Sequence, residues 1–225
     1  MQMKYMSLSG LKFAVAALLL CLLLSPLAAS TQQMPFPFPG IENLEKRVNA
    51  YVPDPRYPDD PYILVTLREG IQGRHEGNGG VGACLVREGT GEIVETGHNR
   101  QYNPHFRSDM HAEMDLLNRY EDKIKGQRFE DGKQQNPRRV EGLVLYTSFE
   151  PCPMCFTRII NAGIKKTLYA VADQPGGMCS RSGDMPPFWK DMGKERFCGE
   201  AACSPELKDI AFQLFGHYSR RNIKR

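Results

Sequence analysis

Two short motifs constrain the fold of this chain more than any other feature. The first is His111-Ala112-Glu113, and the second is Pro151-Cys152-Pro153-Met154-Cys155. Each motif alone is weak, because a lone Cys-x-x-Cys can be redox-active, structural or incidental. Together they supply one imidazole nitrogen and two thiolates, a ligand set that binds zinc. We therefore expect a fold that brings the two motifs together around one Zn²⁺ ion.

The ligand set predicts a catalytic zinc rather than a structural one. His111, Cys152 and Cys155 fill three tetrahedral positions, and no second Cys-x-x-Cys or His-x-x-x-His lies near them in the sequence to close the fourth. An open position lets the ion activate a water molecule. Glu113 is placed to take a proton from that water and to pass it to a substrate ring nitrogen and then to a departing amine.

The surrounding patterns predict an α/β fold, a three-layer α/β/α domain with a mixed sheet. Apolar runs indicate strands over 81–86, 92–97, 142–147 and 167–171, and helical spacing indicates helices from residue 60, after residue 108, over 152–162 and over 205–218. The first two strands form a hairpin, and strand, helix and strand from residue 142 to 171 form a right-handed parallel crossover. Residues 121–140 are expected to be a polar surface insertion, and residues 173–187 a loop rich in Gly and Pro.

Helix starts are predicted from capping residues. Asp60, followed by Pro61, is expected to cap the first helix of the domain. Ser108 or Asp109 is expected to cap the helix that carries Glu113.

The first sixty residues divide into two segments. Residues 1–30 have lysines at 4 and 12, an apolar run over 13–24 and small residues at 28–30, the order typical of a secretory signal peptide. An uncleaved anchor is the alternative, and it would be the protein's only contact with a membrane. Residues 31–59 are rich in proline, with a short helical pattern around 41–48, and form a linker or a wrapping arm. The domain is expected to span residues 60–225.

Charge and cysteine content add two expectations. The formal charge of +3 falls to +1 without the two lysines of the signal segment, so a nucleic-acid partner is not expected and a small molecule is. Cys84 lies in an apolar strand pattern and is expected in the core. Cys179, Cys198 and Cys203 could include a disulfide in an exported protein, and the sequence leaves their pairing open.

The motifs resemble those of the cytidine deaminase-like superfamily, in particular the branch of guanine deaminases, cytosine deaminases and tRNA adenosine deaminases. The resemblance covers about residues 60–225 and rests on the segments 82–86, 97–99, 111–113 and 146–155. The pairing of His-x-Glu with Pro-Cys-x-x-Cys is the known signature of zinc nucleobase deaminases. The resemblance implies that Asn99 hydrogen-bonds the substrate, that the backbone at Ala112 contacts the base, and that the protein is a homodimer.

The expected activity is the hydrolytic deamination of a free nucleobase or nucleoside outside the cytoplasm, with a guanine-type purine favoured. Export disfavours tRNA as the substrate. One alternative is a deaminase that acts on a polynucleotide or as an exported effector, suggested only by Phe188, Trp189 and the basic C-terminus. Another is a zinc-stabilised binding module without activity, which would not need Glu113.

Overall fold

The structure is a computed structural model that describes residues 40–125 and 140–222, with side chains as far as residue 216. The predicted signal peptide and most of the predicted insertion lie outside these residues, so both stay predictions. Within the described part of the chain, no helix has the length and apolar character needed to span a bilayer.

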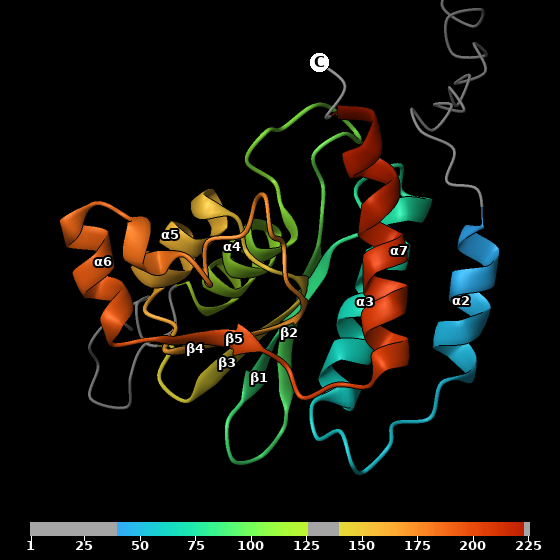
Figure 1. Cartoon of the computed structure of the whole chain (residues 1–225), viewed down its shortest axis with the longest axis horizontal. Coiled ribbons are helices and arrows are strands. Elements are labelled where there is room, and N and C mark those ends of the chain that lie inside the picture. The colour runs from blue at the N-terminus through green and yellow to red at the C-terminus, as the bar shows by residue number, and fades with distance from the viewer. Residues whose placement is uncertain (1–39, 126–139, 223–225) are drawn as a thin grey trace, which may run out of the picture. The chain divides into compact units, whose positions relative to one another are not determined.

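A five-stranded mixed sheet forms the centre of the domain (Figure 1). Its strands are β1 (Gly82–Arg87), β2 (Ile93–His98), β3 (Leu143–Phe149), β4 (Lys166–Val171) and β5 (Phe197–Glu200), in the order β2-β1-β3-β4-β5. Strand β1 runs antiparallel to β2 and β3, whereas β4 runs parallel to β3 and β5. The predicted hairpin and the predicted parallel pairing of β3 with β4 are both confirmed.

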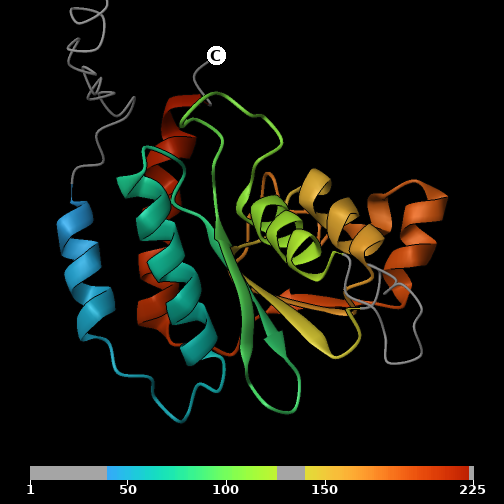
Figure 2. The same ribbon diagram turned by 180° about the vertical axis from the view of Figure 1, so that it is seen from behind.

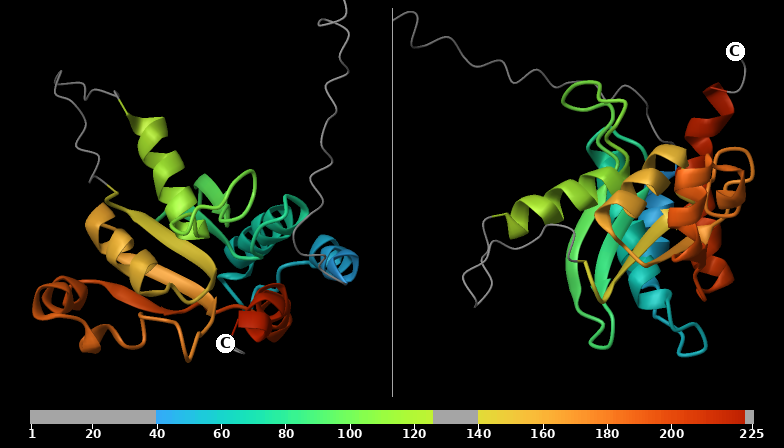
Figure 3. Two further views of the ribbon diagram at one scale, coloured as in Figure 1. Left: turned by 90° about the horizontal axis from the view of Figure 1, so that it is seen from above. Right: turned by 90° about the vertical axis from the view of Figure 1, so that its left-hand side faces the viewer.

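Helices cover both faces of the sheet, which confirms the predicted three layers. One group is α2 (Ile41–Ala50), α3 (Asp60–His75) and α7 (Pro205–Asn222), and the other is α4 (Ala112–Ile124), α5 (Pro153–Ala162) and α6 (Pro187–Lys194). Figures 1 and 2 show the two groups on opposite sides of the sheet, and Figure 3 shows the layers from two further directions. A short 3₁₀ turn, Ser182–Asp184, precedes α6.

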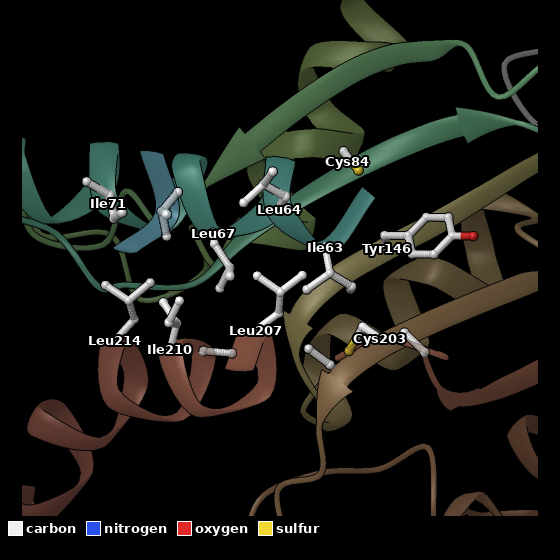
Figure 4. Packing of buried hydrophobic residues seen from close by; sticks show 14 of the residues in the cluster. Ile63, Leu64, Leu67, Ile71, Cys84, Tyr146, Cys203, Leu207, Ile210 and Leu214 are labelled. Atoms are coloured by element: carbon white, nitrogen blue, oxygen red, sulfur yellow. The ribbon is translucent and has the colours of Figure 1, made fainter. Parts of the chain in front are cut away.

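The alternation of side chains along the strands places buried residues on both faces of the sheet. Cys84 and Tyr146 face α3 and α7, where they join buried aliphatic residues such as Leu67 and Leu207 (Figure 4). Their strand neighbours point the other way, and Leu85 and Leu145 pack with residues of α4 and α5. Cys84 is therefore a core residue, as predicted.

The short helical pattern predicted around residues 41–48 forms α2, which belongs to the core. Ile41, Leu44 and Val48 lie on one face of the helix and are buried in the same cluster as the inner faces of α3 and α7. This part of the proline-rich segment is therefore packed rather than free.

Both predicted helix caps are wrong by a short distance. Asp59, not Asp60, precedes α3, and the carboxylate of Asp60 is fully buried, where it accepts hydrogen bonds from Ser204 N (2.7 Å) and the Tyr51 hydroxyl (2.5 Å). His111, not Ser108 or Asp109, precedes α4, because the Asp109 carboxylate is paired with Arg107. The C-terminal end of α5 is as predicted, since Gly163 terminates it with a φ of 89°.

Two elements form where no pattern predicts one. Helix α6 and strand β5 lie between the predicted loop and the last helix. Helix α4 also extends to Ile124, so the first residues of the predicted insertion are helical.

Candidate active site

A cavity of about 240 Å³ lies where the first turns of α4 and α5 meet the C-terminal end of β3. Ligand sites of α/β sheets are common at the carboxyl ends of strands. The residues that line it are Arg74, Gly79, Gly80, Val81, Asn99, Gln101, Tyr102, His111, Ala112, Glu113, Phe149, Glu150, Cys152, Asp173 and Phe215.

The three predicted metal ligands come together at this cavity. His111 and Cys152 are the residues immediately before α4 and α5, and Cys155 lies in the first turn of α5. Their donor atoms all lie within 4.8 Å of one another, and Cys152 Sγ is 3.7 Å from His111 Nδ1. A tetrahedral zinc with ordinary Zn–S and Zn–N bonds separates such atoms by about 3.6 Å, so the donor set fits this ion.

The electrostatics of the ligand set favour a cation. A hydrogen bond from Cys155 lowers the pKa of Cys152 to about 4, although burial opposes the change. The pKa of Cys155 is raised, because its thiol donates to Cys152 and because it is buried. Burial alone would lower the pKa of His111, but Cys152 and Glu113 outweigh it and raise that pKa. The Cys152 thiolate therefore carries a negative charge in the site, and this charge stabilises a cation bound there.

Glu113 is buried beside the ligands. Its side chain lies in the first turn of α4 with 3% of the residue exposed, and the Thr147 hydroxyl donates to its Oε1 at 3.1 Å. Burial raises the pKa of the Glu113 carboxyl. This direction favours the protonated form, which suits the predicted role of Glu113 as a proton carrier.

The two predicted substrate contacts, Asn99 and Ala112, also line the cavity. Asn99 follows β2, and its Oδ1 accepts hydrogen bonds from the backbone N–H groups of Gly79 and Gln101, both at 3.1 Å. Its Nδ2 donates to Gln101 Oε1 at 2.8 Å. Their contact with a substrate stays a prediction.

Sequence reasoning missed several residues of the cavity wall. Glu150 directly precedes the second motif, and its carboxylate accepts hydrogen bonds from Asp173 N (2.9 Å), Ser180 N (2.8 Å) and Ser180 Oγ (2.9 Å). It thereby fixes the loop after β4 against the start of α5. The position of Glu150 next to the second motif could have indicated that it lies at the site. Asp173 is far from both motifs in the sequence, and only the fold brings it to the cavity.

An aromatic pair forms another part of the wall. Phe149 ends β3 and Phe215 lies in α7, and their rings stack with centroids 3.8 Å apart and planes 19° apart. The pair offers a flat apolar surface beside the ligand set.

One of the cysteine pairings that the sequence left open is now assigned. Cys179 and Cys198 form a disulfide that joins the loop after β4 to strand β5. Cys84 and Cys203 are buried thiols without a disulfide.

The fold and the site together define a class of protein. A His/Cys/Cys ligand set at two helix starts, with a buried glutamate two residues after the histidine, in an α/β/α sandwich, is the arrangement of the zinc-dependent deaminases. The profile of the cytidine and deoxycytidylate deaminase zinc-binding region matches residues 59–171, half of the chain. The chain belongs to this family.

Three known proteins illustrate the relationship. The chain is 31% identical over 122 residues to the tRNA-specific adenosine deaminase of Bacillus subtilis (strain 168), a match that covers 54% of this chain and 66% of that enzyme, just under two thirds of its length. The solved guanine deaminase from Nitrosomonas europaea shares the fold with a TM-score of 0.51 and 20% identity, over 83% of this chain and 95% of that one. A mutant protein solved in complex with 8-azaguanine aligns with a TM-score of 0.55 and 19% identity, over 86% of this chain and 98% of that one.

Proposed function

We propose that this protein hydrolytically deaminates a free nucleobase or nucleoside and releases ammonia, with a guanine-type purine as the first expected substrate. The observation that carries the proposal is the buried Glu113 carboxyl beside the His111, Cys152 and Cys155 ligand set, inside a small cavity. A structural metal site has no use for a buried carboxyl in this place.

Each residue of the site has a separate role in the proposed reaction. His111, Cys152 and Cys155 would hold a zinc ion, which would activate a water molecule for attack on the carbon that carries the amine. Glu113 is placed to move two protons, one from the attacking water to the ring nitrogen as the C–O bond forms, and one from the new hydroxyl group to the amine as the C–N bond breaks and ammonia leaves. Its raised pKa favours the protonated carboxyl that holds each proton between these transfers. Thr147 fixes the direction of the Glu113 carboxyl through Oε1. Asn99 and the backbone of Ala112 are proposed to hold the edge of the ring.

The size and lining of the cavity support a single heterocycle as the substrate. At about 240 Å³ the cavity suits a small planar molecule, and the stacked pair of Phe149 and Phe215 gives it one apolar wall. The guanine deaminase and the 8-azaguanine complex reported above support a purine.

A polynucleotide substrate is the second candidate, and one loop favours it. Tyr102 lines the cavity, and Phe106, 67% exposed, lies with its ring centroid 5.8 Å from that of Tyr102. Such a pair could stack a base next to the one that reacts. Phe188 and Trp189, the residues that suggested a groove in the sequence, instead contact each other in α6 and do not line the cavity.

We further propose that the protein is exported. The pattern of residues 1–30 supports export, and so does the Cys179–Cys198 disulfide, because disulfides persist mainly in oxidising compartments. Export in turn favours a free base or nucleoside over tRNA. A homodimer is proposed on the family resemblance alone.

A substrate panel tests the proposed function. Zinc-loaded protein is assayed for ammonia release from guanine, adenine, cytosine, their nucleosides and single-stranded oligonucleotides. We expect turnover of a free base or nucleoside, with guanine first. Turnover of oligonucleotides alone would favour a polynucleotide deaminase instead. No turnover of any compound by protein that contains one zinc per chain would favour a binding module.

A further inference from the structure

His98 has an unusual position behind the cavity wall. It ends β2, its side chain is only 4% exposed, and it is not among the residues that line the cavity. Its Nδ1 lies 2.8 Å from Glu69 Oε2 and its Nε2 lies 2.9 Å from Glu76 Oε2. A carboxylate only accepts hydrogen bonds, so both ring nitrogens must carry a proton to satisfy both contacts. The geometry therefore requires a charged imidazolium.

The charges around His98 match that state. Glu69 reaches it from α3 and Glu76 from the position directly after α3, and Arg100 bridges Glu76 (3.1 Å) and Asp115 of α4 (3.2 Å). Arg119, also from α4, faces Glu69 and lies 3.5 Å from Glu95, which pairs with Lys123 at 3.4 Å. With His98 charged, the acidic and basic groups of this cluster are equal in number. A neutral His98 would leave an excess of negative charge in a largely buried place.

The cluster holds the segment 99–103, which supplies part of the cavity wall. The backbone N–H of His98 donates to Asp115 Oδ2 at 3.2 Å, which ties the segment to α4. The other end is tied to the end of α3, since Asn103 Nδ2 donates to Glu76 O at 2.7 Å and Asn78 Oδ1 accepts from Tyr102 N at 2.8 Å. Asn99 and Gln101, both in the cavity wall, lie between these anchors, and Tyr102, also in the wall, is held by one of them.

We propose that His98 is a positioning residue: its buried imidazolium holds the segment 99–103 in the cavity wall, so that substrate binding, and not the chemical step, weakens when His98 loses its proton. The inference rests on the proposed function, because it concerns the substrate cavity of that same site.

The direction of the pH dependence follows from the contacts. Burial alone would lower the pKa of His98, but hydrogen bonds to Glu69 and Glu76 outweigh it and raise that pKa above the ordinary value of about 6.5. A raised pKa means that the cluster is complete below the ordinary histidine pKa and is lost as pH rises through the raised one. The pKa of Glu69 is lowered by its contact with His98, and that of Glu76 by a hydrogen bond from Gln72 and then by His98, in both cases against the effect of burial. Both carboxylates therefore stay ionised over the same pH range.

The first test needs no deaminase activity. The imidazole signals of the full, zinc-loaded chain are titrated by NMR, and the signal of His98 is assigned by its absence in His98→Gln. We expect His98 to titrate above 6.5. Titration at or below that value would overturn the proposal.

The second test measures kinetics across pH with a matched control. Below neutral pH, His98→Gln should raise KM about tenfold, which is the scale of one lost charge-assisted hydrogen bond. The variant should keep kcat within about twofold of the wild type. Its KM should no longer rise with pH. His75→Gln is the control, because His75 also contacts a carboxylate (Glu45, 3.1 Å) but lies on the surface. It should change neither constant. Equal KM profiles for the wild type and His98→Gln would contradict the proposal.

A further variant keeps the test decisive if His98→Gln does not fold. Glu76→Gln removes one of the two carboxylates, so the pKa of His98 and the midpoint of the KM profile should both shift to lower pH. The positioning role would be contradicted if the midpoint of the KM profile did not shift together with the pKa of His98 measured by NMR. If no substrate is deaminated at all, the proposed function fails, while the NMR titration still decides the charge state of His98.

Discussion

His111 and Glu113 stand two residues apart, and the start of α4 gives them different tasks. His111 precedes the helix in an extended conformation (φ −69°, ψ 167°), which directs its ring toward Cys152. Glu113 lies inside the first turn and meets Thr147 of β3 instead. A single helix start therefore positions both a candidate metal ligand and the buried carboxyl that we propose as the proton carrier.

The ligand assignment is tested by Cys152→Ser. The variant should lose zinc and thermal stability together, because the ion joins the first turns of α4 and α5. Elemental analysis and thermal unfolding measure the two effects. Cys84→Ala is the matched control, since Cys84 is a buried thiol on the opposite face of the sheet and the variant should keep its zinc. Unchanged metal content in Cys152→Ser would refute the assignment.

The residues of the site differ in how far the sequence could predict them. His111, Glu113, Cys152 and Cys155 lie in short motifs, where spacing and residue type together specify the chemistry. Phe215 comes from the last helix, and no local pattern connects it with the motifs. The wrong caps have a similar cause, because the carboxylates of Asp60 and Asp109 bind other partners, interactions that capping preferences alone do not reveal.

At the scale of elements, the segment between β4 and α7 is the part that depends most on long-range contacts. Glu150 fixes Asp173 and Ser180 of this segment by three hydrogen bonds, and the disulfide joins its loop to its own strand, β5. This segment supplies Asp173 to the cavity wall, so its anchoring also shapes the site.

The contribution of the disulfide can be measured directly. Replacing both Cys179 and Cys198 by Ala should lower the free energy of unfolding by about 3 kcal/mol, the value expected for closing a loop of this length, and should leave zinc content unchanged. Urea unfolding with and without a reductant measures the effect. The reductant should destabilise the wild type and not the double variant, and equal stability of the two proteins under oxidising conditions would show that the bond contributes nothing.

Strands β1 to β4 and the helices around them could be predicted, because their apolar residues recur at strand or helix spacing. Helix α6 and strand β5 could not. Helix α6 has eight residues, and its Trp189 and Met192 are only partly buried against the core, so the segment is too short for helical spacing to identify it. Strand β5 has four residues and pairs only at one edge with β4, so the pattern is too short to indicate a strand.

For the whole molecule, the export proposal predicts the start of the mature chain. Protein recovered from outside the cytoplasm should begin near residue 31, as N-terminal sequencing or intact mass would show, because the apolar run of residues 13–24 is followed by small residues suited to cleavage. Soluble cytosolic protein with an intact Met1 would contradict this proposal. Intact Met1 on membrane-bound protein would instead identify the segment as an anchor.

The proposed deamination depends on zinc bound by His111, Cys152 and Cys155 and on proton transfer by Glu113. Its most direct test is a paired measurement of zinc content and ammonia release in the wild type and Glu113→Gln, with the best substrate of the panel. We predict one zinc per chain in both proteins and a loss of turnover of about a thousandfold in the variant, within the range for a general acid and base. Equal turnover of the two proteins at equal zinc content would show that Glu113 takes no part in the reaction and would contradict the proposed mechanism.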